Sequence, residues 1–161
     1  MLYQKEFETS AWGKIYKRSV IADVVFPVGK IYEDIGTIYK FILNAKRVVY
    51  SNRKIYYYLQ RSDSIMGRPY KKNDLDYVYQ AEKLLNDIKN INDKDLIRAA
   101  ESRYVSTNFS VLLKLKKCNS DDEIKNELIS NIRKYGLNMF FNRKVRIKNK
   151  VAWLLTFVNY F

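Results

Sequence analysis

The stretch that decides the fold runs from residue 73 to residue 88 and reads NDLDYVYQAEKLLNDI. Asn73 is a good N-cap residue, and Asp74 and Asp76 follow in the first turn, where the helix dipole favours negative charge. The apolar residues recur every three or four positions and form one stripe: Leu75, Val78, Ala81, Leu85 and Ile88. This spacing predicts a helix over residues 74–90 with its apolar face buried.

The same periodicity continues towards the C-terminus. It predicts helices over 93–116 and 121–135, with Gly136 just beyond the end of the second, and a further helical piece over about 145–160. Residues 69–161 are therefore expected to form a C-terminal helical region.

The first 68 residues have a more mixed pattern. Helical spacing is present over 34–44, whereas RVVY (47–50) and IYYYL (55–59) have the composition of short strands. The predicted fold class is α+β and majority helical, with a short α/β portion over 1–68 followed by the bundle over 69–161. Because two strands alone make a marginal sheet, we expect them to complete a larger sheet outside this chain.

Composition limits the chemistry. The 161 residues include no His and one Cys, which excludes His/Cys zinc sites and His-based triads and fits a reducing compartment. Acid–base chemistry would depend on carboxylates, Lys or Tyr. The net charge of +13 points to nucleic acid, an anionic membrane surface or phosphate-bearing substrates, with simple solubility as the alternative.

Three segments resemble bacterial family 2 glycosyltransferases: SAWGKIYKR (10–18), FPVGKIYED (26–34) and YYLQRSDSI (57–65). Their order and approximate spacing match that family, and the resemblance covers about residues 7–68. It implies the acceptor-side part of an enzyme of polysaccharide biosynthesis, of hexosyltransferase type. The family's nucleotide-binding half and Asp-x-Asp metal motif are not matched. We therefore expect the chain to be the C-terminal part of a longer enzyme, inactive alone.

The resemblance assigns roles to two carboxylates. It implies that Asp34 is the catalytic base, with Glu33 in support. The alternative interpretation is an acidic first turn that complements the dipole of the helix over 34–44.

Five further residues are expected to bind substrate. In the family, the stretch that holds Arg61 and Ser64 lies near the donor diphosphate; a surface arginine is the alternative for Arg61. Lys14 and Tyr16 match a stretch that shapes the acceptor pocket. Trp12 could be a sugar platform, although a core anchor is the favoured interpretation.

The expected partners follow from the same resemblance. They are a nucleotide-sugar donor and a saccharide or lipid-linked acceptor, with Mg or Mn in the complete enzyme and no metal expected on this chain. Residues 142–155 are basic and then apolar, which suits an anionic membrane surface; an ordinary last helix is the alternative. The predicted location is cytoplasmic, at the inner face of the membrane if this segment docks.

Self-association is also expected, and two further alternatives for the function remain. Uncovered strands over 47–59 would favour self-association. A basic helical nucleic-acid-binding module is a different class of function, but acidic residues interleave with the basic ones and no nucleic-acid motif is present. A non-catalytic remnant that serves as an interaction module is the remaining alternative.

Overall fold

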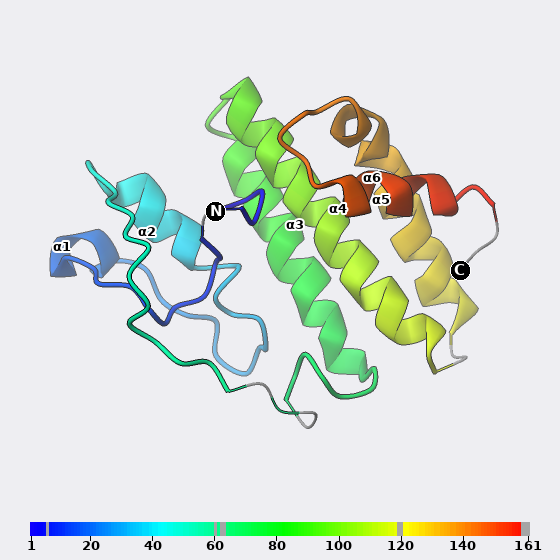
Figure 1. Ribbon diagram of the computed structural model, residues 1–161, viewed down its shortest axis with the longest axis horizontal. Coiled ribbons are helices and arrows are strands. Elements are labelled where there is room, and N and C mark those ends of the chain that lie inside the picture. The colour runs from blue at the N-terminus through cyan, green and yellow to red at the C-terminus, as the bar shows by residue number, and fades with distance from the viewer. Residues whose placement is uncertain (6, 60, 62–63, 119–120, 159–161) are drawn as a thin grey trace.

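The computed structural model describes residues 1–5, 7–59, 61, 64–118 and 121–158, and within them the regular structure is helical. In chain order the elements are α1 (Arg18–Ile21), α2 (Ile38–Asn44), a 3-10 turn (Lys72–Asp74), α3 (Leu75–Lys89), α4 (Lys94–Lys116), α5 (Asp122–Phe140) and α6 (Ile147–Leu155). Figure 1 shows α3, α4 and α5 side by side as an antiparallel bundle, with α6 lying across it.

The bundle confirms the helical periodicity of the sequence. The predicted stripes of α3, α4 and α5 meet in one core, whose fully buried side chains include Leu84, Leu85, Ile88, Leu112, Leu115, Leu128 and Ile132. Burial of such side chains stabilises each helix by roughly 1.5–3 kcal/mol per residue.

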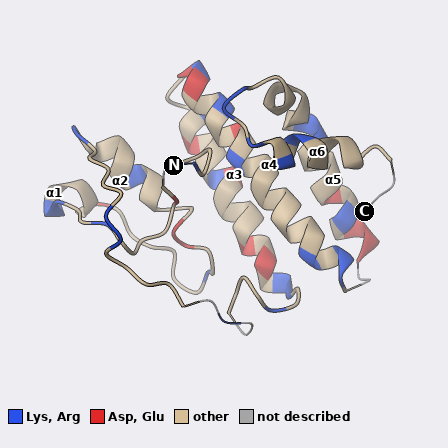
Figure 2. Cartoon of the chain, viewed as in Figure 1, with Lys and Arg blue, Asp and Glu red and all other residues tan. Residues whose placement is uncertain are grey.

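Aspartates cap two of these helices. The Asp93 carboxylate accepts the backbone N–H groups of Asp95 and Leu96 at 2.9 and 3.0 Å and so begins α4. Asp121 has a left-handed φ of 61° and accepts the Ile124 N–H at 3.3 Å. Figure 2 shows the acidic start of α5 in red.

The predicted end of α5 is wrong. Gly136 lies inside the helix, which continues to Phe140. Its glycine character serves packing instead, because the Trp153 ring of α6 lies directly on it.

The predicted α/β portion is also wrong. Among the described residues no strand is present, and residues 45–59 run as extended chain without ladder hydrogen bonds. β-propensity describes side chains that suit a pleated surface, and a strand forms only where a neighbouring backbone pairs with it. The two runs do not pair with each other, so the sheet remnant is absent from this part of the fold.

The N-terminal portion packs on the bundle rather than apart from it. Ile35 and Tyr39 are buried in the same hydrophobic core as α3 and α4. The Tyr39 hydroxyl donates to Asp87 of α3, and Lys30 pairs with Asp76 at 2.9 Å. The division of the chain at residue 68 stays a prediction.

Candidate functional site

Asp34 lies in the turn that leads into α2, with its side chain half-buried. Its Oδ1 accepts the Ile35 N–H at 2.7 Å, and its carbonyl accepts the Ile38 N–H at 2.9 Å. The neighbouring Glu33 carbonyl accepts the Thr37 hydroxyl at 2.7 Å. These bonds fix the turn and hold Oδ1, and no described group bonds the second oxygen, Oδ2.

Two cations, Arg103 on α4 and Lys14 in the N-terminal segment, influence the pKa of Asp34. Burial raises the pKa of the Asp34 carboxyl, and the charge of Glu33 adds to this, whereas Arg103 and Lys14 counteract it. Lys14 is held by its bonds to the Ser10 carbonyl and hydroxyl at 2.6 and 3.0 Å. Burial lowers the pKa of Lys14, while Asp34 raises it. The predicted residues Asp34, Glu33 and Lys14 therefore share one electrostatic neighbourhood.

Arg103 was not predicted from the sequence. It projects from α4 and is only 3% exposed, and its Nη2 donates to the Thr9 hydroxyl at 3.2 Å and the Tyr77 hydroxyl at 3.1 Å. Nε and Nη1 are buried, and neither has a hydrogen-bond partner among the described residues. Arg103 lies three residues after the buried Ala100, next to the apolar stripe of α4. This position was the available signal that its side chain would be buried.

Asp74 is the centre of a second polar cluster that the sequence did not reveal. Its fully buried carboxylate accepts from the Tyr32 hydroxyl at 3.0 Å, from Lys114 at 3.1 Å and from Arg68 at 2.9 Å. Burial alone would raise the pKa of Asp74, but the hydrogen bonds from the Lys71 N–H, from Lys114 and from the Tyr32 hydroxyl hold it below its usual value. Tyr32 stacks on Tyr77 at 4.2 Å, and Tyr77 bonds Arg103, so the cluster continues to the surroundings of Asp34.

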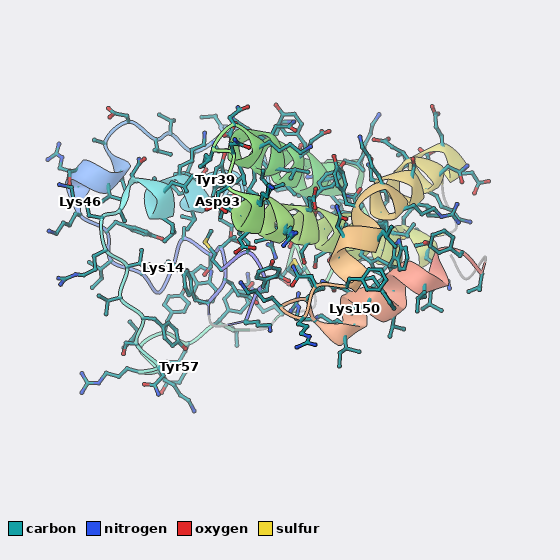
Figure 3. All side chains as sticks on the ribbon, turned by 90° about the horizontal axis from the view of Figure 1, so that it is seen from above. Lys14, Tyr39, Lys46, Tyr57, Asp93 and Lys150 are labelled. Atoms are coloured by element: carbon teal, nitrogen blue, oxygen red, sulfur yellow. The ribbon has the colours of Figure 1, made fainter. Side chains whose placement is uncertain are left out.

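Trp12 lies among aromatic rings at the surface. It stacks with Tyr56 and Tyr58 at centroid distances of 4.7 and 5.1 Å, and all three rings remain exposed. Tyr57 points away from the body of the molecule (Figure 3). Tyr56 and Tyr58 therefore lie on one side of the extended chain and Tyr57 on the other, without a strand partner. The favoured interpretation of Trp12 as a core anchor is wrong, because its exposed ring packs on the extended chain and not in the bundle core.

Tyr16 packs against Phe41, a buried residue of α2. Its ring meets Phe41 edge-on at a centroid distance of 5.1 Å. Its hydroxyl is buried with no hydrogen-bond partner in the described part of the chain, and burial raises the pKa of that hydroxyl.

Arg61 and Ser64 lie at the turn before the bundle. The Ser64 N–H donates to the Arg61 carbonyl at 3.2 Å, and the Ser64 hydroxyl accepts the Gly67 N–H at 3.2 Å. The adjacent Ile65 carbonyl accepts from Lys114 at 2.6 Å, which joins this turn to the Asp74 cluster. Residues 60, 62 and 63 of the same resembling segment lie outside the described residues.

A surface hollow of about 530 Å³ lies elsewhere. It is bounded by the N-terminal segment, the start of α4 and the end of α5, and its lining includes Tyr3, Arg98, Phe141 and Arg143. None of the predicted site residues lines it.

Metal ligands do not gather in the described part of the chain: no three Asp, Glu, Cys or His side chains lie close enough to hold an ion. Asp74 and Asp76, which have the letters of the Asp-x-Asp motif, bind Lys114 and Lys30 instead. None of the described helices combines the length and apolar character needed to cross a bilayer.

Comparison with known proteins agrees with the resemblance in part. Part of this chain is similar to a glycosyltransferase. Over 56 residues, or 35% of its length, it is 38% identical to glycosyltransferase GlyA of Streptococcus pneumoniae serotype 4, and the matched part is 8% of that protein. No protein-family profile and no solved structure matches the chain.

Proposed function

We propose that this chain supplies the acceptor-side part of a family 2 glycosyltransferase, which transfers a sugar from a nucleotide-sugar donor to a saccharide or lipid-linked acceptor. The observation that carries the proposal is Asp34, a carboxylate with one fixed oxygen and one oxygen that no described group bonds, whose ionised form is favoured by the charges of Arg103 and Lys14. The partial similarity to GlyA supports the same class of activity.

Asp34 is suited to the role of a base. The proton of the acceptor hydroxyl moves to Oδ2, the acceptor oxygen bonds C1 of the donor sugar, and the bond from C1 to the diphosphate breaks. The electron pair of that bond leaves with the phosphate oxygen. Burial raises the pKa of the carboxyl and so makes it a stronger base, while the two cations favour its ionised form.

Substrate contacts are assigned by position. Lys14 and Tyr16 would line the acceptor side, and Glu33 would orient the turn that carries Asp34. Arg61 and Ser64 would face the donor diphosphate, where a guanidinium can bind two phosphate oxygens at once. Trp12, stacked with Tyr56 and Tyr58, would offer an exposed ring surface to a sugar.

A divalent metal, Mg or Mn, would help the diphosphate to leave in the complete enzyme. The described residues do not fit such an ion, because no carboxylates gather around a common point. We therefore assign the metal to the part of the complete enzyme that lies outside this chain.

The test has two parts. The 161-residue chain, labelled with ¹⁵N, is titrated with oligosaccharides; we expect weak binding, with Kd near 1 mM, and shifted peaks at Lys14, Tyr16 and Asp34. In a longer enzyme that carries this chain, Asp34→Asn should lower the transfer rate by about 10²–10⁴-fold with donor affinity retained.

The matched control is Asp23→Asn, the same change at an exposed carboxylate outside the site. Peak shifts confined to other surfaces, or an Asp34→Asn enzyme as active as the Asp23→Asn enzyme, would count against the proposal. Sustained sugar transfer by the purified chain alone would contradict its place in a longer enzyme.

A further inference from the structure

α6 has two unlike faces. The inner face packs on the bundle through Ala152, Thr156 and Trp153, whose ring lies on Gly136 of α5. The outer face carries Ile147, Val151 and Leu154, which are 77%, 49% and 48% exposed. These three residues are spaced by four and three positions, so they form one apolar stripe that points away from the bundle.

Cations border this stripe on both sides. At 100° per residue, Lys148 and Lys150 fall on opposite sides of the line through Ile147, Val151 and Leu154. The preceding loop adds the exposed Arg143 and Lys144. Figure 2 shows blue segments along this loop and on α6, and the sequence has no Asp or Glu from residue 128 to residue 158.

We propose that the outer face of α6 is a docking surface for an anionic membrane. A helix with an exposed apolar stripe and lysines along its borders lies in the plane of a bilayer interface, with the stripe among the acyl chains and the cations at the headgroups. Trp153 holds the inner face on α5, so the stripe is presented without unfolding the bundle. This inference goes beyond the proposed transfer reaction and stands or falls separately from it.

Charge selects the membrane over two other occupants. Two copies of this face would bring cations against cations, with no acid between residues 128 and 158 to pair them. A nucleic acid would meet the cations but would leave the apolar stripe in water. An anionic bilayer satisfies both the stripe and its borders.

The experiment is flotation of the full 161-residue chain with lipid vesicles in a density gradient, because aggregates sink whereas vesicle-bound protein rises. The vesicles are phosphatidylcholine alone or mixed with phosphatidylglycerol. We expect flotation with the mixed vesicles only, and weaker binding at high salt. Lys148→Gln with Lys150→Gln should weaken binding about 30-fold, roughly fivefold per lysine.

The stripe is tested by Val151→Ser with Leu154→Ser, which should weaken binding at least about tenfold. Val25→Ser with Val28→Ser is the matched control, because these residues are also highly exposed but lie far from α6 in sequence. Circular dichroism checks that each variant keeps its helices.

Entry of the apolar stripe of α6 into the bilayer is measured in a separate experiment. A polarity-sensitive dye on Val151→Cys, in a Cys118→Ser background, should shift to the blue on mixed vesicles, whereas the dye on Val28→Cys should not. The proposal is overturned if the chain does not float, floats equally with neutral lipid, or binds unchanged after loss of the stripe. It is also overturned if the stripe variants abolish a dimer, or if DNA binds the chain in place of vesicles.

Discussion

The indole ring of Trp153 in α6 lies directly on Gly136 in α5, with no room between them for a methyl group. This contact sets how closely the last helix approaches the bundle. Phe140 and Phe157 flank the indole at centroid distances of 5.3 Å, so Trp153 is the centre of an aromatic cluster that attaches α6.

Gly136→Ala should therefore destabilise the chain. Alanine improves helix propensity by about 1 kcal/mol, but forcing a methyl group into a filled contact costs about 1–3 kcal/mol. In a Trp153→Ala background the space is open, and the same change should stabilise the protein instead. Urea unfolding followed by circular dichroism measures both signs; stabilisation by Gly136→Ala in the presence of Trp153 would show that the two residues are not in tight contact.

Asp34→Asn should stabilise the folded chain at neutral pH. Burial raises the pKa of Asp34 in the folded state, so the folded state binds this proton more tightly than the unfolded state does. The contribution of Asp34 to stability therefore falls as pH rises from the usual carboxyl range through the raised pKa. An amide oxygen can still accept the Ile35 N–H, and it carries no charge to desolvate.

Thermal unfolding at two pH values checks this sign. The variant should unfold at a higher temperature than the wild type at pH 7, and the difference should shrink at pH 3. Asp23→Asn, at an exposed carboxylate, should leave both temperatures unchanged. A lower unfolding temperature for Asp34→Asn at pH 7 would mean that Lys14 and Arg103 outweigh the effect of burial.

The helices could be predicted from the sequence because their hydrogen bonds are local and their apolar stripes need only one buried side. Strands over 47–59 were predicted wrongly, since a strand depends on a partner backbone that composition does not specify. Instead of pairing in a sheet, Tyr56 and Tyr58 stack on Trp12. Gly136 was misjudged for a related reason: a glycine within a helix can serve a neighbour that is distant in sequence.

Residues of the candidate site could be proposed from the sequence only where they belong to a local motif. Asp34 and Lys14 came from resembling segments, whereas Arg103 and Asp74 gained their roles from residues brought together by folding. Asp74 has the local pattern of an ordinary first-turn acid, and nothing in that pattern indicates that Arg68 and Lys114 converge on it.

Asp74→Ala should be strongly destabilising. The change leaves Lys114 and Arg68, both largely buried, without their shared carboxylate, and breaking a buried ion pair in this way costs about 3–5 kcal/mol. The partners of Asp74 lower its pKa in the folded state, so its contribution is present at neutral pH and is lost as pH falls through that lowered pKa.

Urea unfolding at pH 7 measures this cost. Asp76→Ala is the control, because its partner Lys30 is half-exposed, and loss of that pair should cost about 1 kcal/mol or less. Equal losses for the two variants would show that the Asp74 cluster adds nothing beyond a surface pair.

The extended segment over 47–59 should drive self-association. It exposes Val49, Ile55 and Tyr57, the last at 95%, and its backbone makes no ladder bonds among the described residues. Unpaired backbone with apolar side chains is a template for pairing with another chain. Light scattering over a range of concentrations should therefore show dimers or larger assemblies, and Val48→Lys should shift them towards monomer by adding charge to the paired segment.

Val28→Lys makes the same change at an exposed valine outside this segment and should leave the assembly unchanged. If both variants shift the assembly equally, general charge repulsion accounts for the effect, and a wild-type chain that is monomeric at high concentration would show that the segment does not pair.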